Sequence, residues 1–380
     1  MINPGAWLGV LGGGQLGRMF TLAAHRLGYR VMVLDPDPLS VAGAVADRHL
    51  CAALDHGPAL DEMAQVCVAV TLETENAPVA ALERLERDVV VSPAASALAI
   101  GQDRIREKHF IAELGLRPAP YTTVECVADL DSPRIAHLLP GVLKISRFGY
   151  DAKGQAQVTT PAQARAAFID MNCMPCVLER RIDLRMELSV VLARSRDGDT
   201  VLWPVAENCH HNGILDIALM PARISAALAT QIRNAAVKIA ATLAYQGVLC
   251  VEFFVDRSGH LLVNEFAPRP HNSGHGTIDA SLTSQFEQQV RALAGLPLGA
   301  TTMRSPVVIQ NLLGDLWNDG TPRWQVLFGD ATTTLHLYGK AEARPGRKMG
   351  HFSCVAASAD EALGAAVRLR RLLPAAAQRN

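Results

Sequence analysis

The sequence predicts a protein of two or three domains, in which a doubly wound parallel α/β sheet precedes a mixed α+β region. Its 380 residues exceed the size of one ordinary core. The first hundred residues alternate short apolar runs with helical patterns, and longer apolar runs joined by hairpin signals follow. The expected boundaries are 1–118, 119–300 and 301–380, the last a small α/β domain.

The N-terminal elements follow the order that parallel sheets require. An apolar run at Trp7–Leu11 leads into a glycine-rich turn, and a helix over Leu16–Leu27 is stopped by Gly28. A second strand at Arg30–Leu34 ends in Asp35-Pro36-Asp37-Pro38. The pattern continues through Val66–Leu72, Pro78–Arg87 and Val89–Val91, and it closes with a helix at Ile105–Leu114 before Gly115, Pro118 and Pro120.

The later elements include two hairpins and several helices. Asp197-Gly198-Asp199 separates apolar runs at Leu188–Ala193 and Val201–Ala206, and Ser258-Gly259 separates Val248–Val255 from His260–Asn264. Helices are expected at Ala222–Tyr245, Thr283–Ala294 and Ala359–Leu373, and C-terminal strands at Val307–Leu312 and Thr333–Tyr338.

Composition excludes several classes of protein. The residues are 49% hydrophobic and 19% charged, with a net charge of -1. The chain therefore has no net positive charge that would attract nucleic acid or an acidic membrane. No apolar run could span a bilayer and the start does not resemble a signal peptide, so a cytoplasmic protein is expected. Cys173 and Cys176 could join Cys209-His210-His211 in a zinc site, but two cysteines near the start of a strand are the preferred interpretation.

The first motif is Gly12-Gly13-Gly14-Gln15-Leu16-Gly17, which follows a strand and opens a helix. Its glycine spacing, with Asp35 at the end of the next strand, is typical of dinucleotide binding. A phosphate site for another ligand and a simple tight turn are equally consistent with it.

The second motif spans residues 144–155. Lys144 lies in the apolar strand Val142–Ile145, where a lysine can hold nucleotide phosphates as a fixed charge. The following glycine-bounded loop carries Lys153, which could close over a terminal phosphate. The alternative is an ordinary hairpin with surface lysines.

The third motif places two acids in apolar strands, where burial is costly unless each is paired or bound to a metal. A two- or four-residue hairpin loop would put Glu252 opposite Val263 and Glu265 one diagonal step away, roughly 7–8 Å between backbones. Converging carboxylates suit Mg²⁺ that bridges ATP phosphates. The alternative is a solvent-facing strand edge.

The remaining motifs suggest anion binding. Arg269-Pro270-His271-Asn272-Ser273-Gly274-His275 follows Glu265 and could bind a small planar anion such as bicarbonate, although a loop histidine is more often structural. Lys340, Arg344, Arg347 and Lys348 surround a Pro-Gly turn that would gather them around a phosphate monoester. A solvated charged face is equally consistent with this cluster.

Together these motifs resemble the ATP-grasp superfamily, and more closely the bacterial and fungal 5-(carboxyamino)imidazole ribonucleotide synthases, from Gly9 to about Ser353. The most specific stretches are residues 12–19, 148–155, 264–275 and 344–351. The resemblance implies an ATP-grasp fold with a pre-ATP-grasp domain before it. It also implies an ATP-dependent carbon–nitrogen ligase of purine biosynthesis that carboxylates 5-aminoimidazole ribonucleotide through carboxyphosphate.

The resemblance also implies residue roles. ATP would contact Arg104, Lys144, Gly149, Tyr150, Asp151, Ala152, Lys153, Gly154, Gln155, Glu179, Arg180, Arg181, Ile182, Glu187, His210, Asn264 and Glu265. Glu252 and Glu265 would bind two Mg²⁺ ions. The ribonucleotide and bicarbonate would contact Gln15, Leu16, Glu73, Asn76, Tyr150, Asp151, Arg269, His271, Asn272, Lys340 and Arg347. Asp151, Lys153, Arg269 and His271 would be catalytic, with Asp151 or His271 as the general base.

Two departures from the family pattern affect the expected rate more than the identity. Ala152 stands where glycine is usual and would narrow the conformations of the closing loop, and Arg180-Arg181 is an uncommon pair at the adenine hinge. A homodimer is expected, with a possible hand-off of product to a mutase. The competing functions are a nicotinamide-dependent oxidoreductase, an ATP-grasp ligase for formate or another carboxylate, and a nucleotide-binding module without turnover.

Overall fold

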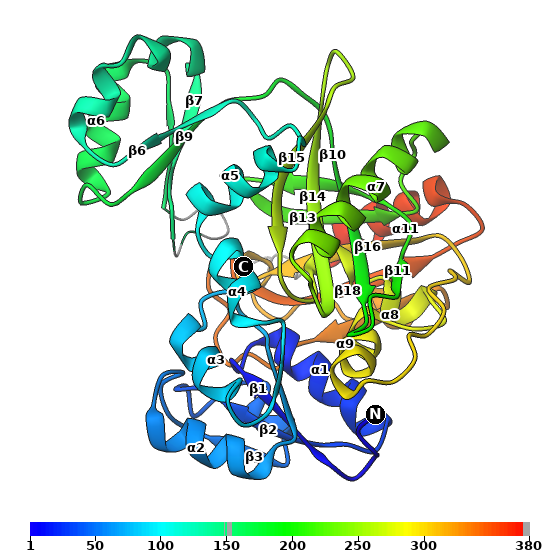
Figure 1. Cartoon of the computed structure of the whole chain (residues 1–380). Helices are drawn as coiled ribbons and strands as arrows, with labels where there is room; N and C mark the ends of the chain where they lie inside the picture. Colours follow the sequence, from blue (N-terminus) through cyan, green and yellow to red (C-terminus); the bar gives the residue numbers. More distant parts are fainter. Residues whose placement is uncertain (148, 150–153, 375–380) are drawn as a thin grey trace.

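The computed structural model describes residues 1–147, 149 and 154–374. Three sheets organise these residues (Figure 1): an N-terminal sheet, a small sheet that projects to one side with helix α6, and a large central sheet. No helix within these ranges is long and apolar enough to cross a membrane. The mixed α/β architecture predicted from the sequence is confirmed.

The N-terminal sheet is fully parallel, with the order β3-β2-β1-β4-β5. Its strands are β1 (Trp7–Leu11), β2 (Arg30–Leu34), β3 (Arg48–Leu50), β4 (Ala69–Leu72) and β5 (Val90–Ser92). Its helices are α1 (Gln15–Arg26), α2 (Gly57–Val66), α3 (Val79–Leu85), α4 (Ala95–Gly101) and α5 (Arg104–Glu113). The doubly wound prediction is confirmed, although β4 starts later than expected because α2 continues through Val66.

The small sheet has the order β6-β9-β7-β8 and is covered by α6 (Pro161–Asp170). Its strands are β6 (Tyr121–Val124), β7 (Gly141–Ile145), β8 (Gln155–Val158) and β9 (Cys176–Arg180). Cys176 begins β9 and its thiol donates to the carbonyl of Met174 at 3.1 Å, as the preferred interpretation of this cysteine pair expects.

The large sheet is antiparallel and contains nine strands in the order β15-β14-β10-β12-β13-β16-β18-β17, with β11 also on β10. The strands are β10 (Leu184–Arg194), β11 (Thr200–Leu202), β12 (Ala206–His211), β13 (Ile214–Met220), β14 (Gly247–Asp256), β15 (Leu261–Ala267), β16 (Val307–Leu313), β17 (Thr333–Leu337) and β18 (Lys348–Val355). The helices are α7 (Ala226–Thr242), α8 (Thr277–Ala280), α9 (Gln285–Ala294), α10 (Gln325–Phe328) and α11 (Ala359–Leu372).

The third expected unit therefore extends the sheet of the second, through the pairing of β13 with β16. The expected strand Val201–Ala206 is divided between β11 and β12 because Pro204 lies between them and cannot donate a backbone hydrogen bond. The boundaries 1–118, 119–300 and 301–380 stay predictions.

A β-bulge changes the expected pairing of the acidic hairpin. Phe253 lies opposite Val263, and the register then shifts so that Glu252 lies opposite Glu265. The prediction that Glu252 faces Val263, with Glu265 on the diagonal, is wrong because Asn264 is an extra residue in β15. The bulge makes the two acids direct neighbours across the strands.

Helix α9 joins the N-terminal sheet to the large sheet through buried glutamines. Gln289 accepts a hydrogen bond from the backbone N–H of Val248 at 2.6 Å and donates to the hydroxyl of Thr71 at 2.7 Å. Gln285 accepts from the N–H of His271 and donates to its carbonyl, at 2.9 and 2.7 Å. These amides fix β4, β14 and the loop of His271 relative to one another.

Replacing Gln289 by leucine should destabilise the protein by about 1–3 kcal/mol, because the buried N–H of Val248 loses its acceptor. The midpoint of urea unfolding would measure the change. The control is Gln231→Leu, at an exposed position of α7, where little effect is expected. Equal stability of the two variants would contradict a joining role for Gln289.

Candidate active site

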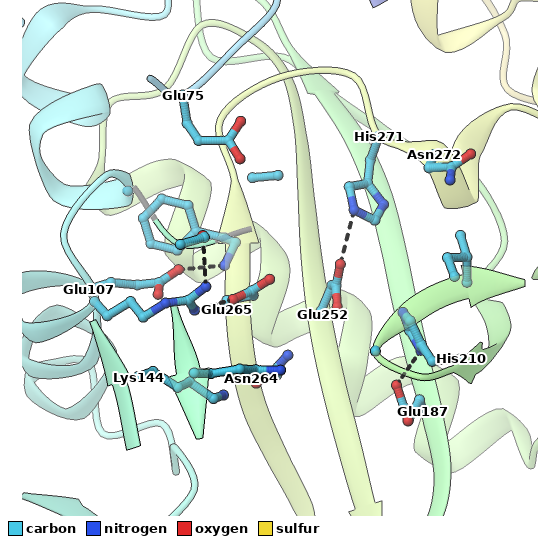
Figure 2. A pocket seen from close by; sticks show the side chains of 18 of the residues that line it. Glu75, Glu107, Lys144, Glu187, His210, Glu252, Asn264, Glu265, His271 and Asn272 are labelled. Carbon is cyan, nitrogen blue, oxygen red and sulfur yellow. Dashed lines mark hydrogen bonds and ion pairs between the residues drawn. The ribbon is translucent and has the colours of Figure 1, made fainter. Parts of the chain in front are cut away.

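A cavity of about 730 Å³ opens where the three sheets meet. The N-terminal domain contributes Gln15 and Glu73, the small sheet contributes Lys144 and Glu179, and the large sheet contributes the acidic hairpin. Figure 2 shows Glu252 between one group of side chains around Glu265 and another around His271 and His210.

Most predicted site residues line this cavity. They are Gln15, Leu16, Glu73, Asn76, Arg104, Lys144, Gly149, Gln155, Glu179, Arg180, Arg181, Ile182, Glu187, His210, Glu252, Asn264, Glu265, Arg269, His271 and Asn272. Gly154, Lys340 and Arg347 are described but do not belong to the lining. Tyr150, Asp151, Ala152 and Lys153 lie outside the described residues.

Each acid of the bulged hairpin contacts a cation from another element. Arg104, the first residue of α5, lies 2.5 Å from the Glu265 carboxylate. The Nε2 atom of His271 lies 2.9 Å from the Glu252 carboxylate, which Figure 2 marks with a dashed line. Two neighbouring carboxylates repel each other, so these cations stabilise the pair.

Glu179 lies between two lysines at the side of the small sheet. Its carboxylate is 3.1 Å from the Nζ atom of Lys144 and 3.2 Å from that of Lys108, and only 4% of its side chain is exposed. Burial would raise the pKa of Glu179, but Lys144, Lys108 and Arg104 together lower it to about 2. Glu179 is therefore a carboxylate at neutral pH, in contact with both lysines.

Arg269 forms a two-pronged contact with Glu75, and one of its hydrogen bonds measures 3.0 Å. Burial would lower the pKa of His271, but the neighbouring Cys250 and Glu252 raise it to about 10. The raised pKa favours the charged form of His271, which faces the cavity together with Arg269.

Buried polar atoms without a protein partner also face the cavity. The side-chain amide of Asn272 uses neither its oxygen nor its nitrogen in a hydrogen bond with a described residue, and the Asn264 Oδ1 atom likewise lacks one. Such atoms are costly to bury without a partner, so a bound polar ligand would satisfy them. Nearby, His210 is 2.5 Å from Glu187, beside a second bulge between β12 and β13.

The glycine turn holds side-chain carboxylates. The N–H of Gly13 donates to Asp35 at 2.7 Å, and that of Gly17 donates to Glu73 at 3.4 Å. A Cβ at Gly14 would lie 2.6 Å from the Glu73 carboxylate, and Gly12 has a φ of +99°. Because acids of the chain use the donors that a pyrophosphate needs, the turn does not support the dinucleotide interpretation.

The C-terminal basic cluster lies at the margin of the cavity. Lys348 lines it, at the start of β18. Arg347 donates to the carbonyl of Glu342 at 3.0 Å, and the Nζ atom of Lys340 lies 5.8 Å from the ring centre of Tyr338. The expectation that Lys340 and Arg347 hold the substrate phosphate stays a prediction, and Lys348 is the member of the cluster that reaches the lining.

Sequence reasoning missed Glu75, Glu107 and Lys108. Glu75 and Glu107 line the cavity, and Lys108 is buried behind it. Glu75 is 194 residues from Arg269, so only the fold reveals that pair. Glu107 and Lys108 resemble ordinary surface charges of a helix, and the sequence offers no signal that both are buried.

Comparison with protein families assigns all three parts of the chain. Residues 6–102 match the ribonucleotide synthetase preATP-grasp domain, residues 109–286 the ATP-grasp domain, and residues 307–364 the phosphoribosylaminoimidazole carboxylase C-terminal domain. The chain is 44% identical to the N5-carboxyaminoimidazole ribonucleotide synthase of Brucella melitensis biotype 1, over 92% of this chain and 96% of that one.

Solved structures agree with this result. A crystal structure of the ADP complex of an N5-carboxyaminoimidazole ribonucleotide synthetase matches with a TM-score of 0.91 and 40% identity, over 97% of both chains. The synthase of Aspergillus clavatus, in complex with ADP and 5-aminoimidazole ribonucleotide, matches with a TM-score of 0.88 and 29% identity. That match covers 97% of this chain and 98% of that one.

The buried carboxylate of Glu179 should make stability depend on acidity. Its ordinary pKa is 4.5 and its folded value is about 2, so its stabilisation is complete above 4.5 and is lost as the pH falls toward 2. The free energy of unfolding, measured with urea at about pH 6 and about pH 3, should therefore change less in Glu179→Gln than in the unaltered protein.

The same variant should also lose about 3–5 kcal/mol at neutral pH, because it leaves Lys108 buried without its carboxylate partner. The matched control is Asp131→Asn, which breaks an exposed pair with Arg165 and should cost at most about 1 kcal/mol. An unchanged pH dependence in Glu179→Gln would refute the assignment.

Proposed function

Because the chain belongs to the N5-carboxyaminoimidazole ribonucleotide synthase family of ATP-grasp ligases, we propose that it uses ATP to join bicarbonate to the amine of 5-aminoimidazole ribonucleotide. The products are the carboxyamino ribonucleotide, ADP and phosphate, in purine biosynthesis. The observation that carries the proposal is a single cavity that contains the fixed ammonium of Lys144, the Glu252–Glu265 pair and the cations Arg269 and His271. The expected homodimer, the cytoplasmic location and the hand-off to a mutase stay predictions.

ATP would occupy the side of the cavity next to the small sheet. Lys144 and Arg104 carry the positive charge that suits its phosphates, and the loop from Gly149 to Gln155 would cover them. The segment from Glu179 to Ile182 follows β9 and would read the adenine, mainly through its backbone, while Glu187 would bind the ribose.

The acidic hairpin fits a magnesium site. Glu252 and Glu265 lie opposite each other, and the orphaned Oδ1 atom of Asn264 faces the same cavity. Mg²⁺ prefers oxygen ligands of this kind. Bound there, the ion would neutralise charge on the ATP phosphates.

Bicarbonate and the ribonucleotide would occupy the opposite side. Arg269, His271 and Asn272 present two cations and an unpartnered amide, which suit a small planar anion. Gln15, Leu16, Glu73 and Asn76 line the part of the cavity next to the N-terminal sheet and would surround the aminoimidazole.

The proposed chemistry needs no protein nucleophile. A bicarbonate oxygen attacks the γ-phosphorus of ATP, the bond to ADP breaks, and carboxyphosphate forms. Carboxyphosphate either breaks down to CO₂ and phosphate, after which the exocyclic amine adds to CO₂, or the amine attacks its carboxyl carbon directly and expels phosphate. In both routes a carbamate forms and a proton leaves the nitrogen. The positive charges of Lys144 and Arg104 stabilise the phosphoryl group in the first step, and exclusion of water protects the intermediate.

The contacts of His271 bear on the choice of base. Both of its ring nitrogens have partners, Nε2 in Glu252 at 2.9 Å and Nδ1 in the N–H of Ser273 at 3.3 Å, so the ring suits the binding of bicarbonate better than the removal of a proton. Of the two expected candidates this favours Asp151, which lies outside the described residues.

Production of ADP by the purified protein with Mg-ATP tests the function. ADP formation should require bicarbonate, which supplies the attacking oxygen, and should be strongly stimulated by 5-aminoimidazole ribonucleotide, whose amine consumes the carboxyphosphate. Formate in place of bicarbonate should not support the reaction. ADP production that ignores both substrates would reject the proposed reaction while leaving an ATP-binding site.

Replacing Glu265 by alanine should lower ATP turnover by at least about hundredfold. The proposed Mg²⁺ site would lose one of its two carboxylates, and the ion would then neutralise the charge on the ATP phosphates poorly. The control is Glu83→Gln, at an exposed position of α3 outside the cavity. Circular dichroism would verify that both variants fold. Full turnover in Glu265→Ala would exclude a catalytic role for the hairpin.

A further inference from the structure

The bulge at Asn264 interrupts the strand ladder beside Glu265, and helix α5 binds the backbone there. The N–H of Phe266 donates to the Oε1 atom of Glu107 at 2.6 Å. The Nζ atom of Lys108 donates to the carbonyl of Asn264 at 3.0 Å. The residues on either side of Glu265 are thus held by two consecutive side chains of one helix.

Both of these side chains are almost fully buried. Glu107 is 2% exposed and Lys108 is 1% exposed. Burying a charge is costly unless it is paired and hydrogen-bonded, and apolar residues of similar size would pack a helix at lower cost. The two polar side chains lie where backbone groups of β15 need partners outside the strand ladder.

The same helix is bonded to the small sheet. The N–H of Arg104 donates to the carbonyl of Ser146 at 2.9 Å, and the hydroxyl of Ser146 donates to Asp103 at 2.5 Å. Ser146 follows directly after β7, the strand that carries Lys144. Lys108 also reaches Glu179 on β9, at 3.2 Å. Helix α5 therefore contacts both walls of the cavity.

We propose that α5 sets the separation of the two walls that hold Mg-ATP, with Glu107 and Lys108 as positioning residues. Glu107 fixes the direction of Glu265 through the backbone of Phe266. Lys108 joins the Asn264 carbonyl to the Glu179 carboxylate and so ties the metal-binding hairpin to the nucleotide hinge. This role rests on the proposed function, because it assigns Mg-ATP to the cavity.

Three substitutions separate positioning from stability. Glu107→Leu removes the acceptor of the Phe266 N–H, and Lys108→Met removes the donor to Asn264, while Glu107→Gln keeps an acceptor without the charge. The control is Glu113→Gln, at an exposed position at the end of the same helix. Thermal unfolding verifies that each variant folds. If Glu107→Leu does not fold, Lys108→Met still tests the contact of α5 with the same bulge.

The measurement is calorimetric binding of ADP with and without Mg²⁺, supported by KM values for ATP and for the ribonucleotide. Glu107→Leu and Lys108→Met should weaken Mg²⁺-dependent ADP binding by about 10–100-fold, as loss of an outer partner of a metal ligand does. The KM for the ribonucleotide should not change. Glu107→Gln should bind Mg-ADP nearly as the unaltered protein does, and Glu113→Gln should be indistinguishable from it.

Two results would overturn the inference. If the Glu107→Leu and Lys108→Met variants fold and keep their affinity for Mg-ADP, α5 has only a structural role. Equal losses in Glu107→Gln and Glu107→Leu would show that the carboxyl group of Glu107 acts directly on the ligand and not through the backbone of Phe266. Because binding is measured without turnover, these results stay distinct from failure of the ligase assay, which would reject the proposed function alone.

Discussion

The placement of two acids side by side in an apolar hairpin is the constraint on which the site depends. The bulge puts Glu252 opposite Glu265, and neither carboxylate is stable there without a cation. Arg104 and His271 supply that charge from two different elements. Helix α5 and the loop after β15 must therefore lie against the hairpin, and their positions define two sides of the cavity.

The other charged side chains of the site are also arranged with opposite charges in contact. Lys144 and Lys108 flank Glu179, and Arg269 is bound to Glu75. Fixed charges need not reorganise when a substrate develops charge, which is how preorganised sites stabilise phosphoryl transfer. In the proposed complex with Mg-ATP, the cations that pair with these carboxylates would face phosphates instead.

The sequence predicted those features that depend on local pattern. Apolar runs and glycine stops located the strands and helices of the N-terminal sheet, and the family resemblance of the ordered motifs named many residues that line the cavity. The sequence could not predict the bulge, because a single extra residue in β15 does not visibly change the alternation of apolar and polar residues along the strand. Nor could it predict the pairing of Arg269 with Glu75 or the burial of Lys108, which arise only when distant elements pack.

The glycine turn shows why a motif must be tested against its surroundings. Its spacing, positive φ at Gly12 and position before a helix all suit a bound phosphate. Yet two of its amides donate to Asp35 and Glu73, so the chain itself uses donors that a bound phosphate would need. Glu73 still lines the cavity, so the turn places a carboxyl group at the part of the cavity next to the N-terminal sheet. The glycines that suggested a cofactor instead let the backbone approach an acid closely enough to fix it.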